Sequence, residues 1–160
     1  LLLLYVQSNG LCNHRSLTNA MKYLFNNVSD EDFIYIHDGD RPLLSTSLLR
    51  RIESESNRHE VIIPALKVFD SLYDYNNKEY VDRSKYRMIQ TPQVAKYKLL
   101  KEAFRLNQDH LEDFKDEGSI IRTIYDDIHF IDGDIYNIKV TDEETYSLAN
   151  LYLKENRHAR

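Results

Sequence analysis

The sequence has one cysteine, no tryptophan, four glycines and three prolines among its 160 residues. Because Cys12 is alone, an internal disulfide and a cysteine-based zinc cluster are excluded, and a reducing, cytoplasmic setting is expected. No low-complexity tract or repeat is present, and 42% hydrophobic with 29% charged residues is ordinary for a soluble domain. We therefore expect residues 1–160 to form one domain.

Long hydrophobic runs and an excess of positive charge are also missing. Residues 1–4 are apolar, but they are too short for a membrane span and lack the basic leader of a signal peptide. They resemble the inside of a strand, so we expect the chain to begin within a larger protein. The net charge of −5, with acids and bases interspersed, argues against a nucleic-acid partner and is still compatible with a small anionic ligand.

The usual signatures of hydrolases and metalloenzymes do not occur. No pair of carboxylates is spaced for acid–base hydrolysis, and no serine or cysteine occupies a nucleophile elbow. His14, His37, His59 and His110 are scattered and show no metal-ligand spacing to a carboxylate. The remaining candidates are basic and hydroxyl side chains at loop ends, which suit the holding of phosphates and the stabilisation of charge.

The most informative stretch is residues 34–42, Ile-Tyr-Ile-His-Asp-Gly-Asp-Arg-Pro. A run of β-branched and aromatic residues that ends abruptly in polar residues is typical of a buried strand reaching the edge of a sheet, where open α/β sheets bind ligands. We predict that Asp38 and Arg41 face a ligand and that Gly39 allows a tight turn between them. The alternative is an ordinary polar turn in which Asp38 and Arg41 pair with each other.

The order of the expected elements indicates an α/β fold with a doubly wound, mostly parallel sheet. Strands are predicted at residues 1–6, 33–37, 61–63 (ended by Pro64), 128–131 and 135–140. Helices are predicted from residue 16, from Ser45 or Thr46 through Ile52, around residues 97–104 and 120–124, and from Thr141, in a capping box with Glu144, through Leu153.

Residues 66–90 are predicted to form a protruding β-hairpin arm. Its two halves, 66–75 and 78–88, flank Asn76 and Asn77, which tolerate the left-handed backbone of hairpin turns. The halves carry several tyrosines but few aliphatic side chains, so the arm does not bury itself against its own core. Because an isolated hairpin is marginally stable in water, we expect it to dock on a partner subunit and to form a homodimer.

Four pieces of sequence, at residues 37–42, 82–83, 90–93 and 137–141, together resemble one family. They occur in the order and rough spacing seen in the 2-C-methyl-D-erythritol 4-phosphate cytidylyltransferases and the related ribitol 5-phosphate cytidylyltransferases. The resemblance implies a Rossmann-like fold and transfer of a cytidylyl group from CTP to a sugar-alcohol phosphate. Pyrophosphate would be released, and Mg²⁺ or another divalent cation would be the cofactor.

The resemblance also implies roles on the nucleotide side of the site. Asp38 and Gly39 would lie near the nucleotide, and Ser16 would read the cytosine ring. Asp38 would also bind the metal ion and take part in catalysis. Lys139 would be catalytic and would stabilise the charge that builds on the α-phosphate. An ammonium at a strand end suits that role on physical grounds as well. The alternative for Lys139 is a solvent-exposed lysine before a helix cap.

On the acceptor side, the resemblance implies binding by residues from the strand ends and from the arm. Arg41, Thr91 and Thr141 would contact the substrate. Catalytic Arg83, with Asp70 and Ser71, would reach from the arm into the partner subunit and hold the acceptor phosphate.

The chain departs from the family pattern in several places. The glycine-rich loop that wraps the triphosphate does not occur in this sequence, Asn13 stands where an arginine is usual, and Asp40 replaces a small or apolar residue. Lys115 stands where the family has a hydroxyl before an acid. We therefore expect this segment alone to be inactive or nearly so, because most of the grip on the triphosphate is missing.

Three interpretations follow from the resemblance and its departures. The leading one is a cytidylyltransferase that acts on 2-C-methyl-D-erythritol 4-phosphate in isoprenoid synthesis. The second is a ribitol 5-phosphate cytidylyltransferase of teichoic-acid or capsule synthesis, which residues 134–139 resemble somewhat. The third, motivated by Asp40 and Asn13, is a non-catalytic module that binds a sugar phosphate or dimerises.

Overall fold

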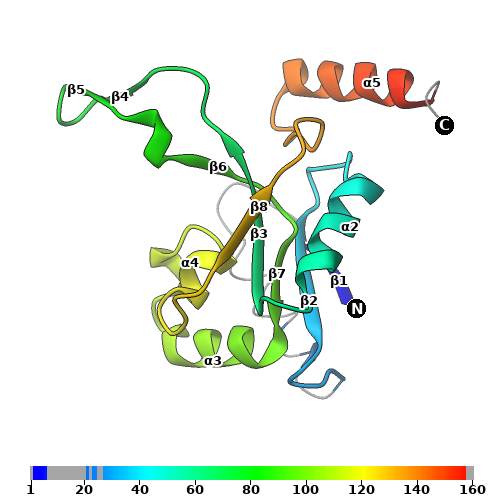
Figure 1. Ribbon diagram of the computed structural model, residues 1–160, viewed down its shortest axis with the longest axis vertical. Helices are drawn as coiled ribbons and strands as arrows, with labels where there is room; N and C mark the ends of the chain where they lie inside the picture. Colours follow the sequence, from blue (N-terminus) through cyan, green and yellow to red (C-terminus); the bar gives the residue numbers. More distant parts are fainter. Residues whose placement is uncertain (1, 7–20, 22, 25–26, 158–160) are drawn as a thin grey trace.

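The computed structural model describes residues 2–6, 21, 23–24 and 27–157 (Figure 1). Its main feature is a sheet in which neighbouring strands follow the order β1-β2-β7-β3-β6, with β8 also paired to β3. The strands are β1 (Leu2–Val6), β2 (Phe33–Asp38), β7 (Gln93–Lys96), β3 (Val61–Lys67), β6 (Arg87–Ile89) and β8 (His129–Asp132).

Four of the six described strands of this sheet run in one direction. β1 is parallel to β2, and β8 is parallel to β3. β7 lies between β2 and β3 and is antiparallel to both, so β2 and β3 point the same way. The predicted α/β fold is thus confirmed, but the sheet is mixed and not mostly parallel, because the reversed strands β6 and β7 make three of its five described pairings antiparallel.

β6 and β7 together act as one antiparallel partner of β3, interrupted by a bulge. Ile62 pairs with Val94 and Ala65 pairs with Ile89, so two residues of β3 face the four residues 90–93. The predicted end of β3 at Pro64 is wrong, because the strand continues to Lys67. Pro64 fits inside the strand since its carbonyl oxygen still accepts the Gln90 N–H at 2.9 Å and only its missing N–H is lost.

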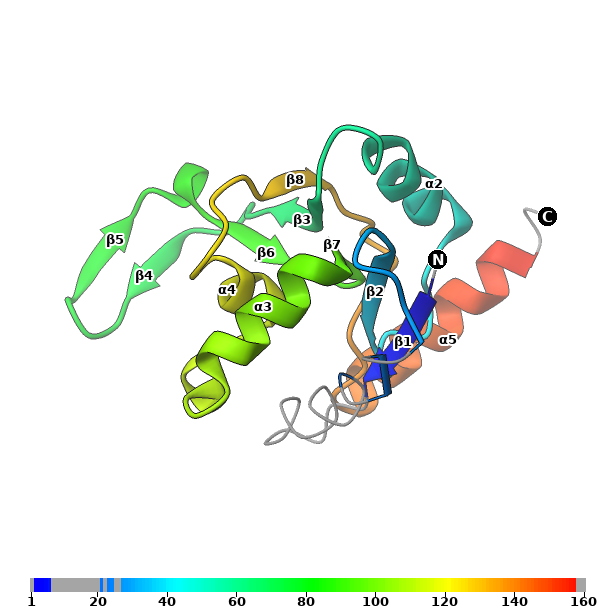
Figure 2. The same cartoon turned by 90° about the horizontal axis from the view of Figure 1, so that it is seen from below.

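Successive side chains of the central strands point alternately into two separate hydrophobic cores. On one face, Ile34, Ile36, Val61 and Ile63 pack with residues of α3 (Tyr97–Asn107) and α4 (Glu117–Ile121). On the other face, Tyr35, Ile62 and Val94 pack with Leu48 and Ile52 of α2 (Thr46–Glu55). Figure 2 shows α2 and α3 on opposite sides of the sheet, as the doubly wound prediction requires.

The helix boundaries agree partly with the predictions. Ser45 caps α2 as expected, since its hydroxyl accepts the Leu48 N–H at 3.1 Å. A short 3-10 helix, η2 (Leu111–Asp113), separates α3 from α4. Of the helix predicted from residue 16, residues 21, 23 and 24 are described and helical, whereas Asn27 and Val28, at its predicted end, are not helical. No helix in the described part of the chain is long and apolar enough to cross a lipid bilayer.

The last predicted strand and the last predicted cap are wrong. Residues 135–140 form no strand, because their backbone groups bond to buried side chains and to the loop after β2. Helix α5 (Glu143–Arg157) is capped by Asp142 instead of Thr141. Asp142 Oδ1 accepts the Thr145 N–H at 2.8 Å, and Thr145 Oγ1 accepts the Asp142 N–H at 3.2 Å.

The predicted hairpin arm is present and projects from the sheet (Figure 1). It contains β4 (Leu72–Asp74), β5 (Glu79–Val81) and the 3-10 helix η1 (Arg83–Lys85). No residue from 66 to 89 is buried. The left-handed residue of its turn is Lys78, with φ 56°, and not Asn76 or Asn77. The N–H groups of Asn76 and Asn77 instead bond to Asp74 Oδ1.

We predict that Ile52→Ala destabilises the protein by about 2–5 kcal/mol, because Ile52 is fully buried between α2 and the sheet. The free energy of unfolding is measured by urea denaturation. Glu53→Ala on the exposed side of the same helix is the matched control and should change stability by about 0.5 kcal/mol or less. Equal urea midpoints for the two variants would contradict the packing of α2 on the sheet.

Candidate active site

The carboxyl end of β2 carries a compact cluster of charged side chains. Asp38 Oδ2 accepts hydrogen bonds from Arg41 Nε at 3.1 Å and from Lys139 Nζ at 3.2 Å. The side chains of Asp38 and Arg41 are 13% and 12% exposed, while Lys139 is 34% exposed. The structure thus brings together three predicted site residues from positions about a hundred residues apart. The pairing of Asp38 with Arg41, posed as the alternative, is one part of this larger cluster.

Asp40 supplies a second carboxylate to Lys139. Lys139 Nζ lies 3.7 Å from Asp40 Oδ2, and the Val140 N–H donates to the Asp40 carbonyl oxygen at 2.8 Å. Lys139 thus lies within ion-pair distance of two carboxylates and is about one third exposed, which differs from the solvent-exposed lysine of the alternative interpretation. The two acids balance the two bases of the cluster, so the positive groups are held in place before any anion binds.

Behind the cluster, a buried hydrogen-bonded chain fixes the end of β2. His37 Nε2 bonds to the Arg41 carbonyl oxygen at 3.0 Å, and His37 Nδ1 bonds to Thr91 Oγ1 at 2.9 Å. Burial lowers the pKa of His37, which favours the neutral ring. Because a carbonyl only accepts, Nε2 carries the hydrogen and Nδ1 accepts the Thr91 hydroxyl proton. Thr91 Oγ1 in turn accepts the Asp38 N–H at 3.0 Å.

The segment that delivers Lys139 is held by two buried amide side chains. Gln90 Nε2 donates to the carbonyl oxygens of Asp134 at 2.9 Å and Asn137 at 3.2 Å, and Gln90 Oε1 accepts the Asp134 N–H at 2.9 Å. Asn137 Nδ2 donates to the Thr91 carbonyl oxygen at 2.6 Å. Arg41 completes this clamp with a bond to the Asn137 carbonyl oxygen at 2.8 Å.

Glu117 is a buried carboxyl close to the cluster that was not among the predicted site residues. It is 6% exposed, and burial raises its pKa to about 7, with further contributions from Asp116 and Asp38. Gln93 anchors this end of α4, since its amide bonds to Asp116 Oδ2 at 2.9 Å and accepts the Gly118 N–H at 2.6 Å. In the sequence Glu117 stands two residues after Lys115, and no spacing pattern marked it as a site residue.

Other predicted site residues lie outside the cluster. Arg83, Asp70 and Ser71 are exposed on the arm, and the Arg83 guanidinium bonds to the Phe69 carbonyl oxygen. Thr141 is exposed, and its hydroxyl bonds to Asp142 at 3.3 Å. Gly39 lies in the exposed turn after β2. Ser16 and Asn13 lie outside the described residues.

The donor groups at this edge fit a magnesium ion. Mg²⁺ prefers oxygen ligands and is usually bound through one or two carboxylates together with the phosphates of a substrate. Asp38 and Asp40 place two carboxylates beside Lys139, at the carboxyl end of β2. Asp38, which was predicted as the metal ligand, is therefore chemically suited to that role, and Asp40 provides a second oxygen donor beside it.

We predict that the stability of the protein without substrate falls as the pH rises from 5 to 7.5, because of Glu117. A carboxyl whose folded pKa lies near 7, above its usual 4.5, favours the folded state fully below pH 4.5 and loses this contribution as it ionises. The loss is on the order of 2–3 kcal/mol over that interval. Urea denaturation of wild type and Glu117→Gln at both pH values measures it as a difference. Parallel pH profiles would contradict the buried, protonated state of Glu117.

Comparisons with known proteins agree with this geometry. The family model described as "IspD: 2-C-methyl-D-erythritol 4-phosphate cytidylyltransferase" matches residues 8–155. The enzyme of that name from Thermosipho melanesiensis is 34% identical over 151 residues, which are 92% of this chain and 66% of the relative. The one from Bacteroides thetaiotaomicron is 32% identical over 138 residues, 85% of this chain and 60% of the relative. The chain thus spans less than two thirds of the length of both relatives.

Solved structures lead to the same family. A crystal structure of 4-diphosphocytidyl-2C-methyl-D-erythritol synthase superposes with a TM-score of 0.78 at 28% identity, covering 90% of this chain and 68% of that chain. The enzyme from Thermus thermophilus shares the fold, with a TM-score of 0.78 at 22% identity and coverage of 91% and 70%. Since the family model covers nearly the whole chain, the chain belongs to the 2-C-methyl-D-erythritol 4-phosphate cytidylyltransferase family.

Proposed function

We propose that the protein of which this chain is part transfers a cytidylyl group from CTP to 2-C-methyl-D-erythritol 4-phosphate. A phosphate oxygen of the acceptor attacks the α-phosphorus of CTP, the bond from that phosphorus to the bridging oxygen breaks, and pyrophosphate leaves. The observation that carries the proposal is the meeting of Lys139, Arg41 and Asp38 at one strand edge. Names of the relatives favour this acceptor over ribitol 5-phosphate. The lone cysteine supports the expected cytoplasmic setting.

In this reaction, Lys139 stabilises the negative charge that increases on the α-phosphate in the transition state. Its ammonium is held in advance by Asp38 and Asp40 at 3.2 and 3.7 Å, so little reorganisation is needed when substrate binds. Arg41 is held by Asp38 through Nε and by the Asn137 carbonyl oxygen through Nη1, so its positive charge is fixed beside Asp38 at the end of β2. Asp38 would hold Mg²⁺, which when bound neutralises charge on the nucleotide phosphates.

We predict that Lys139→Ala lowers turnover on the order of 10²-fold or more, as expected when one preorganised charge-stabilising group is lost. Pyrophosphate release is measured with CTP and 2-C-methyl-D-erythritol 4-phosphate, using the complete protein encoded by the gene that contains this sequence. Lys154→Ala, at an exposed position of α5, is the matched control and should keep full activity. Unchanged turnover in Lys139→Ala would remove the role proposed for this residue. Faster release with ribitol 5-phosphate would reassign the acceptor.

The arm supports a second part of the proposal, which is a homodimer. Phe69, Tyr75 and Tyr80 are 75%, 86% and 79% exposed, although aromatic side chains are usually at least partly buried. They lie on the same projecting hairpin as Arg83, Asp70 and Ser71. In the proposed dimer, the partner subunit covers these rings. The arm then carries Arg83 to the partner's acceptor site.

We predict that deletion of residues 70–86 converts a dimer into a monomer, as measured by sedimentation velocity. Because Lys67 pairs with Arg87, Val68 and Phe69 remain as a two-residue loop, and replacing them with Asn-Gly suits a tight hairpin. Circular dichroism checks that the sheet is retained. Identical oligomeric states of the two proteins would contradict the dimer.

A further inference from the structure

A second cluster of titratable side chains lies at the sheet edge opposite Asp38. Glu55 ends α2, His59 lies in the loop before β3, and His129 begins β8. β2, β3 and β8 point the same way. The beginnings of β3 and β8 therefore lie at one end of the strands, and the end of β2, with Asp38, lies at the other. The proposed reaction does not use this cluster. The histidines show no metal-ligand spacing to a carboxylate in the sequence, but the fold brings His59 and His129 together beside Glu55.

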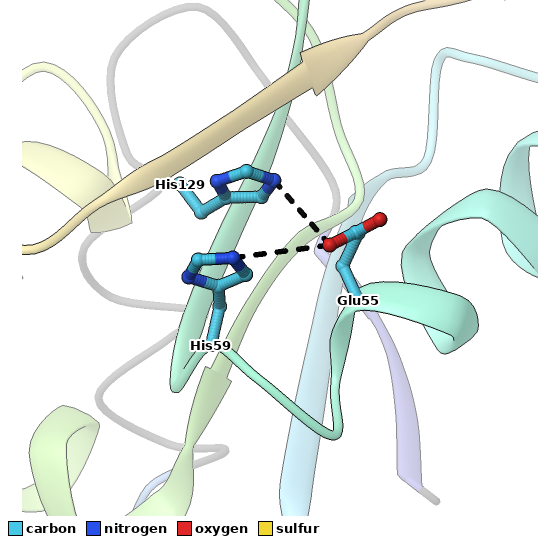
Figure 3. A group of neighbouring side chains, drawn as sticks. All are labelled: Glu55, His59 and His129. Atoms are coloured by element: carbon cyan, nitrogen blue, oxygen red, sulfur yellow. Dashed lines mark ion pairs between the residues drawn. The ribbon is translucent and has the colours of Figure 1, made fainter.

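The two imidazoles converge on one carboxylate oxygen (Figure 3). Glu55 Oε2 lies 3.8 Å from His59 Nε2 and 3.6 Å from His129 Nε2. Potential ligand atoms from the three residues all lie within 4.8 Å of one another. In a tetrahedral zinc site with bonds of about 2.0–2.2 Å, neighbouring donor atoms are roughly 3.3–3.5 Å apart. The separations from the carboxylate oxygen therefore need to close by about half an ångström or less.

The carboxylate is oriented from its other side. Arg58 Nη2 donates to Glu55 Oε1 at 3.1 Å, which turns Oε2 toward the two rings. The Arg58 side chain is 69% exposed, so this contact lies on the solvent side of the cluster. The side chains of Glu55, His59 and His129 are 22%, 25% and 33% exposed. An ion can therefore reach them from solvent, and a water molecule can complete its coordination.

The rings are stacked, with centroids 3.7 Å apart and planes inclined by 2°. An imidazole binds a metal ion through the lone pair of one ring nitrogen, and both stacked rings bring Nε2 toward the same carboxylate oxygen. His59 Nδ1 is buried and has no hydrogen-bond partner among the described residues, so no bond at that atom fixes the ring. An ion lies near the plane of each imidazole that binds it. The stack must therefore open, by rotation about the Cβ–Cγ bonds, when an ion enters.

We propose that Glu55, His59 and His129 bind a divalent transition-metal ion, with Zn²⁺ as its representative. Two imidazole nitrogens and one carboxylate oxygen are a donor set that zinc takes in proteins, and this set leaves one position for water. Imidazole suits Zn²⁺, Ni²⁺ and Cu²⁺, whereas Mg²⁺ prefers oxygen ligands alone. The site is therefore distinct from the one proposed at Asp38. The bound ion ties the end of α2 to the beginnings of β3 and β8.

The test is a titration of Zn²⁺ into the tag-free, metal-free 160-residue chain, followed by calorimetry and thermal unfolding. We expect one ion per chain and an increase in the unfolding temperature of about 5–10 °C at a hundredfold excess over Kd. A hundredfold excess of Mg²⁺ should neither displace the ion nor reproduce the increase. No saturable binding of Zn²⁺, or equal stabilisation by Mg²⁺, would overturn the proposal.

Substitutions locate the ion. His59→Gln and His129→Gln should each weaken Zn²⁺ binding about 100-fold or more. Loss of a residue that only hydrogen-bonds to a metal ligand weakens binding about 10- to 100-fold, so the larger effect identifies a direct ligand. His110→Gln is the matched control, since His110 is exposed and outside the cluster. His14→Gln combined with Cys12→Ser tests residues outside the described part of the chain. Both controls should bind as wild type does. Binding that persists unchanged in His129→Gln would overturn the assignment.

A measurement on the wild type keeps the proposal testable if a variant does not fold. Co²⁺ in place of Zn²⁺ should give the intense visible absorption of a four- or five-coordinate ion. The ring protons of two histidines should shift at the same time, because the stack opens. The weak absorption of octahedral, hydrated Co²⁺ together with unshifted histidine signals would contradict the site.

Discussion

The candidate active site depends on one set of buried amide hydrogen bonds. Gln90 and Asn137 hold residues 134–137 against the bulge between β6 and β7, in a place where a regular strand ladder would otherwise satisfy the backbone. This clamp fixes the position from which Lys139 reaches Asp38. Leaving buried amide partners unsatisfied costs about 1–3 kcal/mol each, so the segment has a strong preference for this one arrangement.

The charged cluster holds the positive side chains of Arg41 and Lys139 in position before a phosphate binds. Pairing with carboxylates lowers the free-energy cost of keeping these charges partly buried. Arg41 and Lys139 share Asp38 Oδ2, and Lys139 also pairs with Asp40. Buried or half-buried charges are expensive unless they are paired, and here the carboxylates provide the pairing in the absence of an anion. An incoming phosphate and its metal ion can exchange places with these contacts. The departure at Asp40 is thus compatible with an anion site, because its charge is already balanced by Lys139.

Several parts of this fold and site could be predicted from the sequence alone. Local patterns identified β2 with its polar end, the cap at Ser45, the helix around residues 97–104 and the protruding hairpin, because each depends on neighbours in the chain. The strand expected at residues 135–140 was wrong, since side chains from Gln90 and Arg41 outcompete strand pairing there. Asp142 capped α5 because its carboxylate, and not the Thr141 hydroxyl, reaches the Thr145 N–H.

The features that sequence did not predict depend on distant contacts. Glu117 was overlooked because its burial results from packing between α4 and the sheet, which no spacing pattern shows. His129 meets Glu55 and His59 only because β8 pairs with β3 after a separation of about seventy residues. The roles proposed for Arg83, Asp70 and Ser71 involve a partner subunit, so a single chain shows only that they are exposed on the arm.

The two cores on either face of the sheet have a consequence for how such proteins tolerate changes in length. Successive residues of β2 alternate between the cores, as Ile34, Tyr35 and Ile36 do. Inserting one residue into β2 would exchange the faces and turn Asp38 away from Lys139. Residues 68–86 of the arm impose no such register, because none of them belongs to either core. A change of chain length is therefore less disruptive to the two cores in the arm than in β2, although the reach proposed for Arg83 still limits the length of the arm.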